Sequence, residues 1–294
     1  MSGRDAMQSS MRVLVATDLS DPAEVALREG AALAANPQDA LAVVHVLPPL
    51  PFIKMWLPSI DDNVERTAAR ASETVRRRMH AVIGDRAEVF VEDGVDYAAI
   101  VKRAKAWRAD VIVIGSHGRS GLARAFGGVA DRVLRNAHCS VLVARTCAAR
   151  GWVLAATDLS DPSFPAVTAA AREARRRSAQ LEVVHAVGFL DVEASYLIAL
   201  GTPSITPTPR VYEVAARELS ERVASLGVQA TCKVLDRPAA AAIVAECEVI
   251  GAELVVVGAR GTTGLGVLSL GGIADKVARA APCSVLVVRQ EMGG

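Results

Sequence analysis

The sequence predicts an α/β protein of two tandem open-sheet domains, each a five-stranded, mainly parallel sheet with helices on both faces. The heptapeptide ATDLSDP occurs twice, at 16–22 and 156–162. Each half alternates short β-branched runs with longer helical patterns, which is typical of βαβ units and a parallel sheet. A glycine-rich loop also precedes the last helical pattern of each half, at 115–128 and 258–272.

The two halves are related by a nearly constant offset: 158 − 18 = 140 for Asp18 and Asp158, and 283 − 139 = 144 for Cys139 and Cys283. A period as long as a domain indicates a duplicated domain and not a solenoid of short repeats. The 294 residues suffice for two domains of about 145 residues, each with its own core. We expect the boundary near Arg150. The predicted segments are a disordered tail at 1–10, a first domain at 11–148 and a second domain at 151–290.

Each half contains five short apolar or β-branched runs that predict strands. In the first half these are 12–17, 41–47, 87–91, 111–115 and 140–145, with helices at 22–35, 63–83, 96–107 and 128–137. The second half repeats the strands at 152–157, 181–187, 229–235, 253–258 and 284–289. Runs that end at glycine after about five apolar residues suit parallel strands buried on both faces. Serine and aspartate before Pro22 and Pro162 predict capping side chains at two helix starts.

Composition excludes several classes of protein. The net charge is +1 with both signs interspersed, so the electrostatic footprint of a nucleic-acid binder is missing. No apolar run is long enough to span a membrane, and the first ten residues lack the apolar core of a secretory signal. The five cysteines include no CxxC pair, which argues against a disulfide framework or a metal site. We therefore expect a cytoplasmic protein with reduced cysteines and with no nucleic-acid or membrane partner.

The segments after the second strand, 48–60 and 188–210, differ most between the halves, and both contain proline. Irregular segments of this kind often carry specificity for a ligand or partner. A solvated crossover explains them equally well, and both interpretations stay open.

The candidate site lies where the strands end. Ligands of open parallel sheets bind beyond the carboxyl ends of the strands, at the point where strand order reverses. The first predicted strand ends at Ala16-Thr17-Asp18, and the fourth ends at the start of the loop GSHGRSGLARAFGG, 115–128. The second half has ATD at 156–158 and GARGTTGLGVLSLGG at 258–272. Both sets face one crevice if these strands are neighbours.

The glycine loops fit a phosphate-binding role, because glycine lets the backbone approach an anion and the amides at a helix start favour phosphate. A tight strand-to-helix turn is the alternative. Neither loop contains a lysine, which excludes a Walker P-loop, and the GxGxxG fingerprint is absent.

Taken together, these motifs resemble the universal stress protein family over nearly all of 11–290. The shared features are VATDLS and AATDLS, the histidine of VVHV and VVHA, the two glycine loops, and the final strands HCSVLVA and PCSVLVV. The resemblance implies a five-stranded fold of the HUP-like type in both halves of a tandem protein. It also implies ATP as the ligand.

The resemblance assigns site residues in both halves. Those expected near adenine and ribose in the first half are Ala16, Asp18, Val46 and Ile114, and those expected near phosphate are Gly115, Gly118, Gly127 and Gly128. Further candidates for the site are Thr17 and Val129, and the loop side chains His117 and Arg119 are candidates for phosphate contact. The second half offers Ala156, Thr157, Asp158, Ala186, Val257, Gly258, Arg260, Gly261, Gly271 and Gly272. Two features depart from the family pattern G-x2-G-x9-G followed by Ser or Thr. Glycine replaces the hydroxyl residue in both halves, at Gly128 and Gly272. Eight residues separate Gly118 from Gly127 in the first loop, where nine separate Gly261 from Gly271 in the second.

Individual side chains allow two interpretations. Asp18 and Asp158 suit ribose hydroxyls or water-mediated Mg²⁺, although an aspartate at a strand end also caps local turns. His45 and His185 fit hydrogen-bonded core residues better than catalytic ones.

We expect a nucleotide-binding regulatory module, because neither loop supplies the repeated base, metal carboxylates and charge clamp of phosphoryl transfer. The alternatives are an adaptor that binds an unknown protein partner without nucleotide, and a slow ATPase. The family resemblance implies that terminal strands pair, so the halves should form a pseudo-dimer within one chain, with a homodimer of whole chains beyond it.

Overall fold

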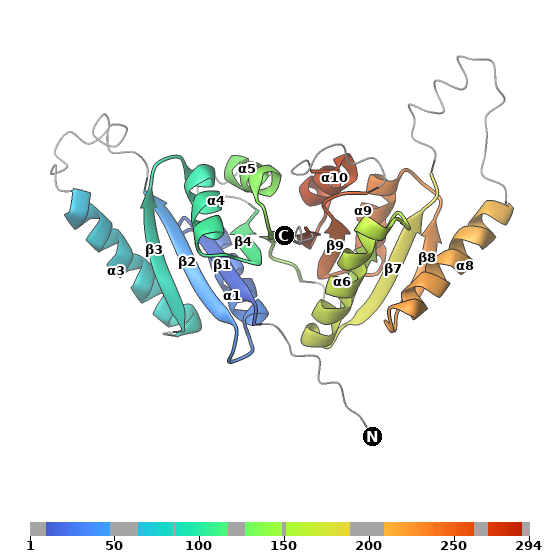
Figure 1. Ribbon diagram of the computed structural model, residues 1–294, viewed down its shortest axis with the longest axis horizontal. Helices are drawn as coiled ribbons and strands as arrows, with labels where there is room; N and C mark the ends of the chain where they lie inside the picture. The colour runs from blue at the N-terminus through green and yellow to red at the C-terminus, as the bar shows by residue number, and fades with distance from the viewer. Residues whose placement is uncertain are drawn as a thin grey trace, which may run out of the picture. The chain divides into compact units, whose positions relative to one another are not determined.

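The computed structural model describes residues 10–47, 64–84, 86–116, 127–148, 151–188, 209–261 and 270–289. The chain divides into two compact units, 1–139 and 140–294 (Figure 1). Most of the predicted tail at 1–10, and the predicted boundary at Arg150, lie outside the described residues.

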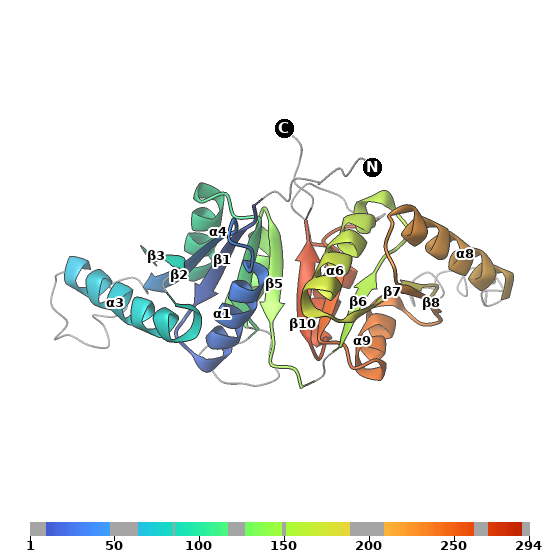
Figure 2. The ribbon, with the colours of Figure 1, turned by 90° about the horizontal axis from the view of Figure 1, so that it is seen from below.

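The first unit is a parallel sheet with helices on both faces. Its elements are β1 (Arg12–Thr17), α1 (Asp21–Leu33), β2 (Ala40–Leu47), α3 (Val64–Ile83), β3 (Ala87–Asp93), α4 (Asp96–Ala106), β4 (Val111–Gly115) and α5 (Gly128–Asn136). The strand order is β3-β2-β1-β4, with parallel pairing. Figure 2 shows α1 and α3 on one face of these strands and α4 on the other. The order reverses at β1, which places the candidate site beside β1 and β4.

The second unit repeats this plan and adds the last strand of the first half. Its elements are β5 (Ser140–Ala144), β6 (Trp152–Ala156), a short 3-10 turn (Asp161–Ser163), α6 (Phe164–Arg177), β7 (Gln180–Ala186), α8 (Pro209–Ser225), β8 (Thr231–Leu235), α9 (Ala239–Val249), β9 (Leu254–Gly258), α10 (Gly272–Ala280) and β10 (Ser284–Val288). The strand order is β5-β10-β9-β6-β7-β8. The strands from β10 to β8 are parallel. The predicted α/β class and mainly parallel sheets are confirmed.

The two terminal strands pair with one another, as predicted. β5 runs antiparallel to β10, with Leu142 opposite Leu286. Two matching hydrogen bonds close the ends of the pair: the N–H of Arg145 donates to Ser284 Oγ at 3.1 Å, and the N–H of Arg289 donates to Ser140 Oγ at 3.2 Å. This pairing covers the outer edge of β10, which would otherwise leave its backbone groups unpaired.

The predicted capping side chains are wrong. Ser20 and Ser160 occupy the position before the helical turn in extended backbone, yet neither hydroxyl caps it. Each hydroxyl donates instead to Oδ1 of the aspartate two residues earlier. The main-chain oxygen of Ser20 still accepts from the N–H of Ala23 at 3.0 Å. The polar side chains at these helix starts therefore order the strand-end turn and not the helix.

None of the helices in the described part of the chain is long and apolar enough to cross a membrane.

One acidic side chain lies inside the second unit. Glu182 of β7 is 6% exposed, and its Oε1 has no hydrogen-bond partner among the described residues. Burial raises the pKa of Glu182, and the neighbouring Glu246 raises it further, while Lys233 lowers it. Lys233 Nζ donates to Glu246 Oε1 at 2.7 Å. Glu182 in the folded chain therefore holds its proton more tightly than a solvent-exposed glutamate does.

This burial predicts a pH-dependent effect of Glu182→Gln. Because the folded-state pKa is raised, the native state holds this proton more tightly than the unfolded chain. The stability that it contributes is thus lost as pH rises above the usual glutamate value of about 4.3. Glutamine keeps a neutral side chain at every pH. Thermal unfolding of both proteins should show a midpoint difference in favour of the variant that widens as pH rises. A difference that stays constant with pH would contradict the assignment.

Candidate functional site

The first strand ends in a hydrogen-bonded turn that fixes an aspartate. Thr17 Oγ1 accepts a hydrogen bond from the N–H of Leu19 at 3.1 Å, and Asp18 Oδ1 accepts one from the N–H of Ser20 at 3.0 Å. Leu19 has a φ of 66°, which lies in the left-handed region that residues other than glycine rarely adopt. The carboxylate of Asp18 is therefore held at the carboxyl edge of the sheet.

The second half builds the same turn. The N–H of Leu159 donates to Thr157 Oγ1 at 3.0 Å, the N–H of Ser160 donates to Asp158 Oδ1 at 3.0 Å, and the φ of Leu159 is 65°. The Thr157 hydroxyl also shares a hydrogen bond of 2.6 Å with Ser163 Oγ. An unfavourable dihedral at both corresponding positions points to a functional constraint on this turn.

The two strand histidines lock these turns to the neighbouring strand. His45 Nδ1 lies 2.8 Å from the main-chain oxygen of Thr17, and His185 Nδ1 lies 2.9 Å from that of Thr157. The predicted hydrogen bonds are confirmed for both, but the predicted core position is wrong, because both rings are only half-buried and His185 lines an open cavity. A His that holds the strand-end carbonyl positions the aspartate that follows it.

The sheet order brings the predicted adenine-side residues to one edge in each unit. Ala16 pairs with Ile114 on β4, and Ala156 pairs with Val257 on β9. Val46 and Ala186 lie near the carboxyl ends of β2 and β7, the strands on the other side of β1 and β6. The first and fourth strands of each half are therefore neighbours, as the crevice requires.

The glycine loops are closed at their ends by one main-chain hydrogen bond each. The N–H of Gly127 donates to the oxygen of Ser116 at 2.9 Å, and the N–H of Gly271 donates to that of Ala259 at 2.8 Å. These bonds bring the start of the following helix back to the end of the fourth strand. The helix amides therefore lie at the same edge as the aspartate turn.

The helix starts are open to solvent. Gly128 and Gly272 are the first residues of α5 and α10, and both are exposed. Val129 follows in α5, while Gly115, Gly258 and Arg260 lie at the other ends of the two loops. Three predicted contacts, His117, Gly118 and Arg119, lie outside the described residues, as do residues 262–269 of the second loop.

The second loop begins directly against the aspartate turn. A Cβ atom placed on Gly261 would lie 2.2 Å from Asp158 Oδ2 and 3.1 Å from its Cγ. Only glycine leaves space for the carboxylate at this point. Asp158, which follows β6, and Gly261, which follows β9, were predicted separately for the site and are therefore in contact.

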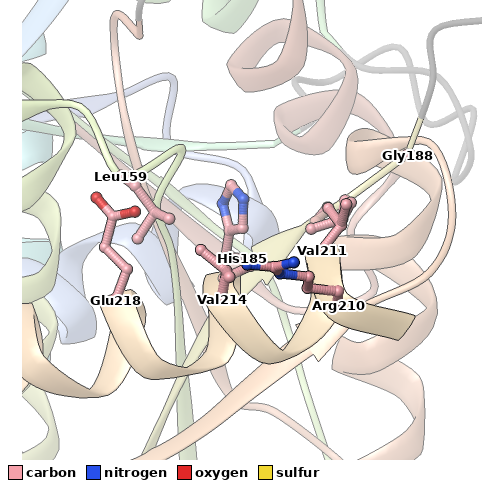
Figure 3. Close-up of a pocket in the computed structure, with 10 residues that line it drawn as sticks. Leu159, His185, Gly188, Arg210, Val211, Val214 and Glu218 are labelled. Atoms are coloured by element: carbon pink, nitrogen blue, oxygen red, sulfur yellow. The ribbon is translucent and has the colours of Figure 1, made fainter. Parts of the chain in front are cut away.

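An open cavity of about 650 Å³ adjoins this turn in the second unit (Figure 3). It lies between the carboxyl end of β7 and helix α8. Its lining residues are Leu159, His185, Ala186, Val187, Gly188, Arg210, Val211, Val214, Ala215 and Glu218. In Figure 3, Leu159 and Glu218 lie on one side of His185, and Arg210 and Val211 lie on the other. Mostly apolar walls with a few polar groups suit a small organic ligand.

Sequence reasoning found only part of this lining. Ala186 was predicted for the site, and Gly188 and Arg210 bound the segment 188–210 that was considered for specificity. The contributions of Val211, Val214 and Glu218 were missed. These three have the spacing of one helix face, and only the packing of α8 on the sheet brings that face to the site.

Within the described residues, no group of three or more His, Cys, Asp or Glu side chains could hold a metal ion.

Comparison with known proteins supports the assignment of both halves. The model of the universal stress protein family matches residues 10–145 and 151–289. The universal stress protein Rv2005c of Mycobacterium tuberculosis is 31% identical over 300 residues, which covers 95% of this chain and 97% of that protein. A second protein of that organism, universal stress protein Rv2623, is 29% identical over 315 residues, covering 97% of this chain and 98% of that protein.

The fold is shared with solved structures. A universal stress protein from Archaeoglobus fulgidus superposes with a TM-score of 0.64 at 20% identity, covering 95% of this chain and 96% of that one. Since the family model matches both halves and the relatives span the whole length, the chain belongs to the universal stress protein family as a tandem member.

Proposed function

We propose that the chain binds ATP at the carboxyl edge of its sheets, in the second half at least, and acts in the cytoplasm as a regulatory module of the stress response. The observation that carries this is the contact between Asp158 and Gly261 beside the cavity under α8. This contact places a carboxylate that can accept hydrogen bonds from ribose beside a glycine loop suited to phosphate and a mostly apolar cavity suited to the base.

The base would occupy the cavity. Its volume of about 650 Å³ lies within the usual range for small-molecule sites, about 300–1,000 Å³. Leu159 and Val214 offer apolar surface for a purine ring. Asp158 would accept hydrogen bonds from ribose hydroxyls, which a charged acceptor makes stronger.

The phosphates would lie over the start of α10. The amides there carry the positive end of the helix dipole, and the exposed Gly272 leaves them accessible. Arg260 would add positive charge. Mg²⁺, if bound, would take most of its ligands from phosphates and water, with Asp158 as the protein carboxylate.

Binding rather than turnover is the proposed role. Phosphoryl transfer requires a positioned base, metal-binding carboxylates and a charge clamp. The described residues at each strand-end turn supply one carboxylate, Asp18 or Asp158, already held by Ser20 or Ser160. Weak ATP hydrolysis, a homodimer of whole chains and an unidentified protein partner stay predictions.

The proposal is tested by denaturing the purified protein and identifying the released nucleotide by ion-pair chromatography. We expect adenine nucleotide near one or two equivalents per chain. An empty protein that also fails to take up added Mg-ATP would overturn the proposal and favour the adaptor.

Restoring the hydroxyl at the start of α10 should strengthen binding. A Cβ on Gly272 meets no atom within 4 Å, so serine fits without displacing its surroundings. One new hydrogen bond of about 0.5–1.5 kcal/mol corresponds to a roughly two- to tenfold gain in ATP affinity. Calorimetric titration of Gly272→Ser against Gly272→Ala isolates the hydroxyl. Equal affinities of the two variants would show that no phosphate lies within its reach.

A further inference from the structure

Helix α3 of the first unit carries a strong positive charge. It contains five arginines and two glutamates, which gives a net charge of 5 − 2 = +3. Helix α8, which follows the second strand of the other half, contains three arginines and three glutamates and is neutral. The proposed ATP site in the second half leaves the charge of α3 without a role.

The two helices align through their buried residues, which share an offset of 144: Val75 with Leu219 and Met79 with Val223. The same offset matches Arg70 with Val214 and Thr74 with Glu218. Val214 and Glu218 line the cavity in the second unit. The first half therefore has a cation in place of an apolar wall residue, and a neutral hydroxyl in place of a carboxylate.

This face of α3 is turned toward the strand-end turn of the first half. Arg78 Nη1 donates to the main-chain oxygen of Leu19, the residue of that turn with a φ of 66°. Arg70, Thr74 and Arg78 are spaced four residues apart, and residues at this spacing are neighbours on one side of a helix. Both arginines are exposed, and Thr74 Oγ1 donates to the main-chain oxygen of Arg70 at 2.9 Å. Two guanidinium groups therefore lie on the side of α3 that meets the turn carrying Asp18.

We propose that Arg70 and Arg78 bind a phosphoryl group of a small ligand at the carboxyl edge of the first unit. A guanidinium group donates paired N–H bonds to phosphate oxygens, and its charge strengthens them. Each guanidinium has five N–H donors, so the bond from Arg78 to Leu19 leaves donors for a ligand. The second half presents a mostly apolar cavity at the corresponding place, so the two halves would select different ligands.

The inference rests on the proposed function only in treating the carboxyl edge of each sheet as a binding site. It needs no ATP in the first half.

The test titrates the full chain with two probes that carry phosphoryl groups and no base, inorganic tripolyphosphate and fructose 1,6-bisphosphate. Calorimetry at low and high salt measures the affinity, and hydrogen exchange with mass spectrometry locates the bound probe. We expect at least one probe to bind, more weakly as salt rises, and to protect peptides from α3 and from the turn after β1. Whichever probe binds separates polyphosphate from a phosphorylated sugar as the source of the group.

Matched variants separate this face from the overall charge of the helix. Arg70→Val copies the residue of the second half and should weaken binding of the probe about tenfold. Arg77→Val removes the same charge at a position whose counterpart, Glu221, does not line the cavity. Arg77 Nε lies 3.8 Å from Glu73 Oε1, and both side chains are exposed. This variant should change the affinity less than about twofold.

The proposal fails if neither probe binds, if protection appears only in the second unit, or if the two variants lose affinity equally. Arg70→Val should still bind ATP in the second unit as the wild type does. A wild type that binds a probe at α3 but takes up no ATP would count against the proposed function and support this inference.

Discussion

Replacing Gly261 with alanine is expected to lower the affinity of the second unit for ATP by about ten- to a hundredfold. The added Cβ would lie 2.2 Å from Asp158 Oδ2, so the carboxylate must move. Asp158 is pinned by Ser160, whose N–H donates to Oδ1 at 3.0 Å, and any movement weakens this bond or the contact with ligand. The loss of one hydrogen bond to a charged group costs about 1.5–3 kcal/mol, which gives the expected factor.

A matched control comes from the same loop. Gly272→Ala adds the same methyl group where a Cβ meets nothing within 4 Å, so its ATP affinity should equal that of the wild type. Calorimetric titration of both variants with Mg-ATP gives the comparison, and circular dichroism confirms that both are folded. Unchanged affinity in Gly261→Ala would remove Asp158 and this part of the loop from the site.

The second large effect concerns stability of the first unit. In Gly30→Ala, the new Cβ would lie 2.3 Å from Val15 Cγ2, and Val15 is fully buried in β1. Valine is stiff about χ1, so it cannot move aside. Overpacking costs about 1–3 kcal/mol, against a gain of up to about 1 kcal/mol from helix propensity. We expect a net destabilisation of about 1–2 kcal/mol.

The second half indicates how to reverse this effect. Ala170 and Ala155 occupy the positions that correspond to Gly30 and Val15, since 170 − 30 = 140 and 155 − 15 = 140. Both alanines are fully buried. In the double variant Gly30→Ala with Val15→Ala, the loss in free energy of unfolding should therefore be smaller than the sum of the losses in the two single variants, by about 1 kcal/mol or more.

Hydrogen exchange in urea, followed by mass spectrometry, measures the stability of each unit separately in the wild type, the two single variants and the double variant. Peptides from β1 and α1 should lose protection in Gly30→Ala and regain part of it in the double variant. Peptides from β6 and α6 are the control and should not change. Additive effects would mean that the helix shifts away from β1 and that the two side chains do not compete for one space.

Much of the fold follows from local sequence patterns. Short apolar runs that end at Gly115 and Gly258 mark strands buried on both faces. β4 has the bounds expected from its run, and β9 begins at Leu254, one residue after the expected start. Other ends differ by a few residues, as in β8, which begins at Thr231 where a start at Gln229 was expected. Alternating exposure of side chains identifies the middle of a strand better than its end.

The site was harder to predict because its parts come from distant segments. The turn at Asp158 and the loop at Gly261 are visible separately, and their contact requires β6 and β9 to be neighbours. The role of Ser160 was predicted incorrectly, because serine before a proline-started turn is equally able to bond backwards to Asp158. The α8 wall of the cavity has no sequence motif. Val211 and Val214 are ordinary apolar residues until the helix packs against β8 and faces the end of β7 across the cavity.

The most direct test of ATP binding in the second half is a crystal structure of the full chain with saturating Mg-ATP. The account predicts density for the base in the cavity bordered by Leu159, Ala186 and Val214, with ribose beside Asp158 and phosphates at Gly271 and Gly272. A map in which this edge of the second unit is empty, or in which ATP binds elsewhere, would contradict it.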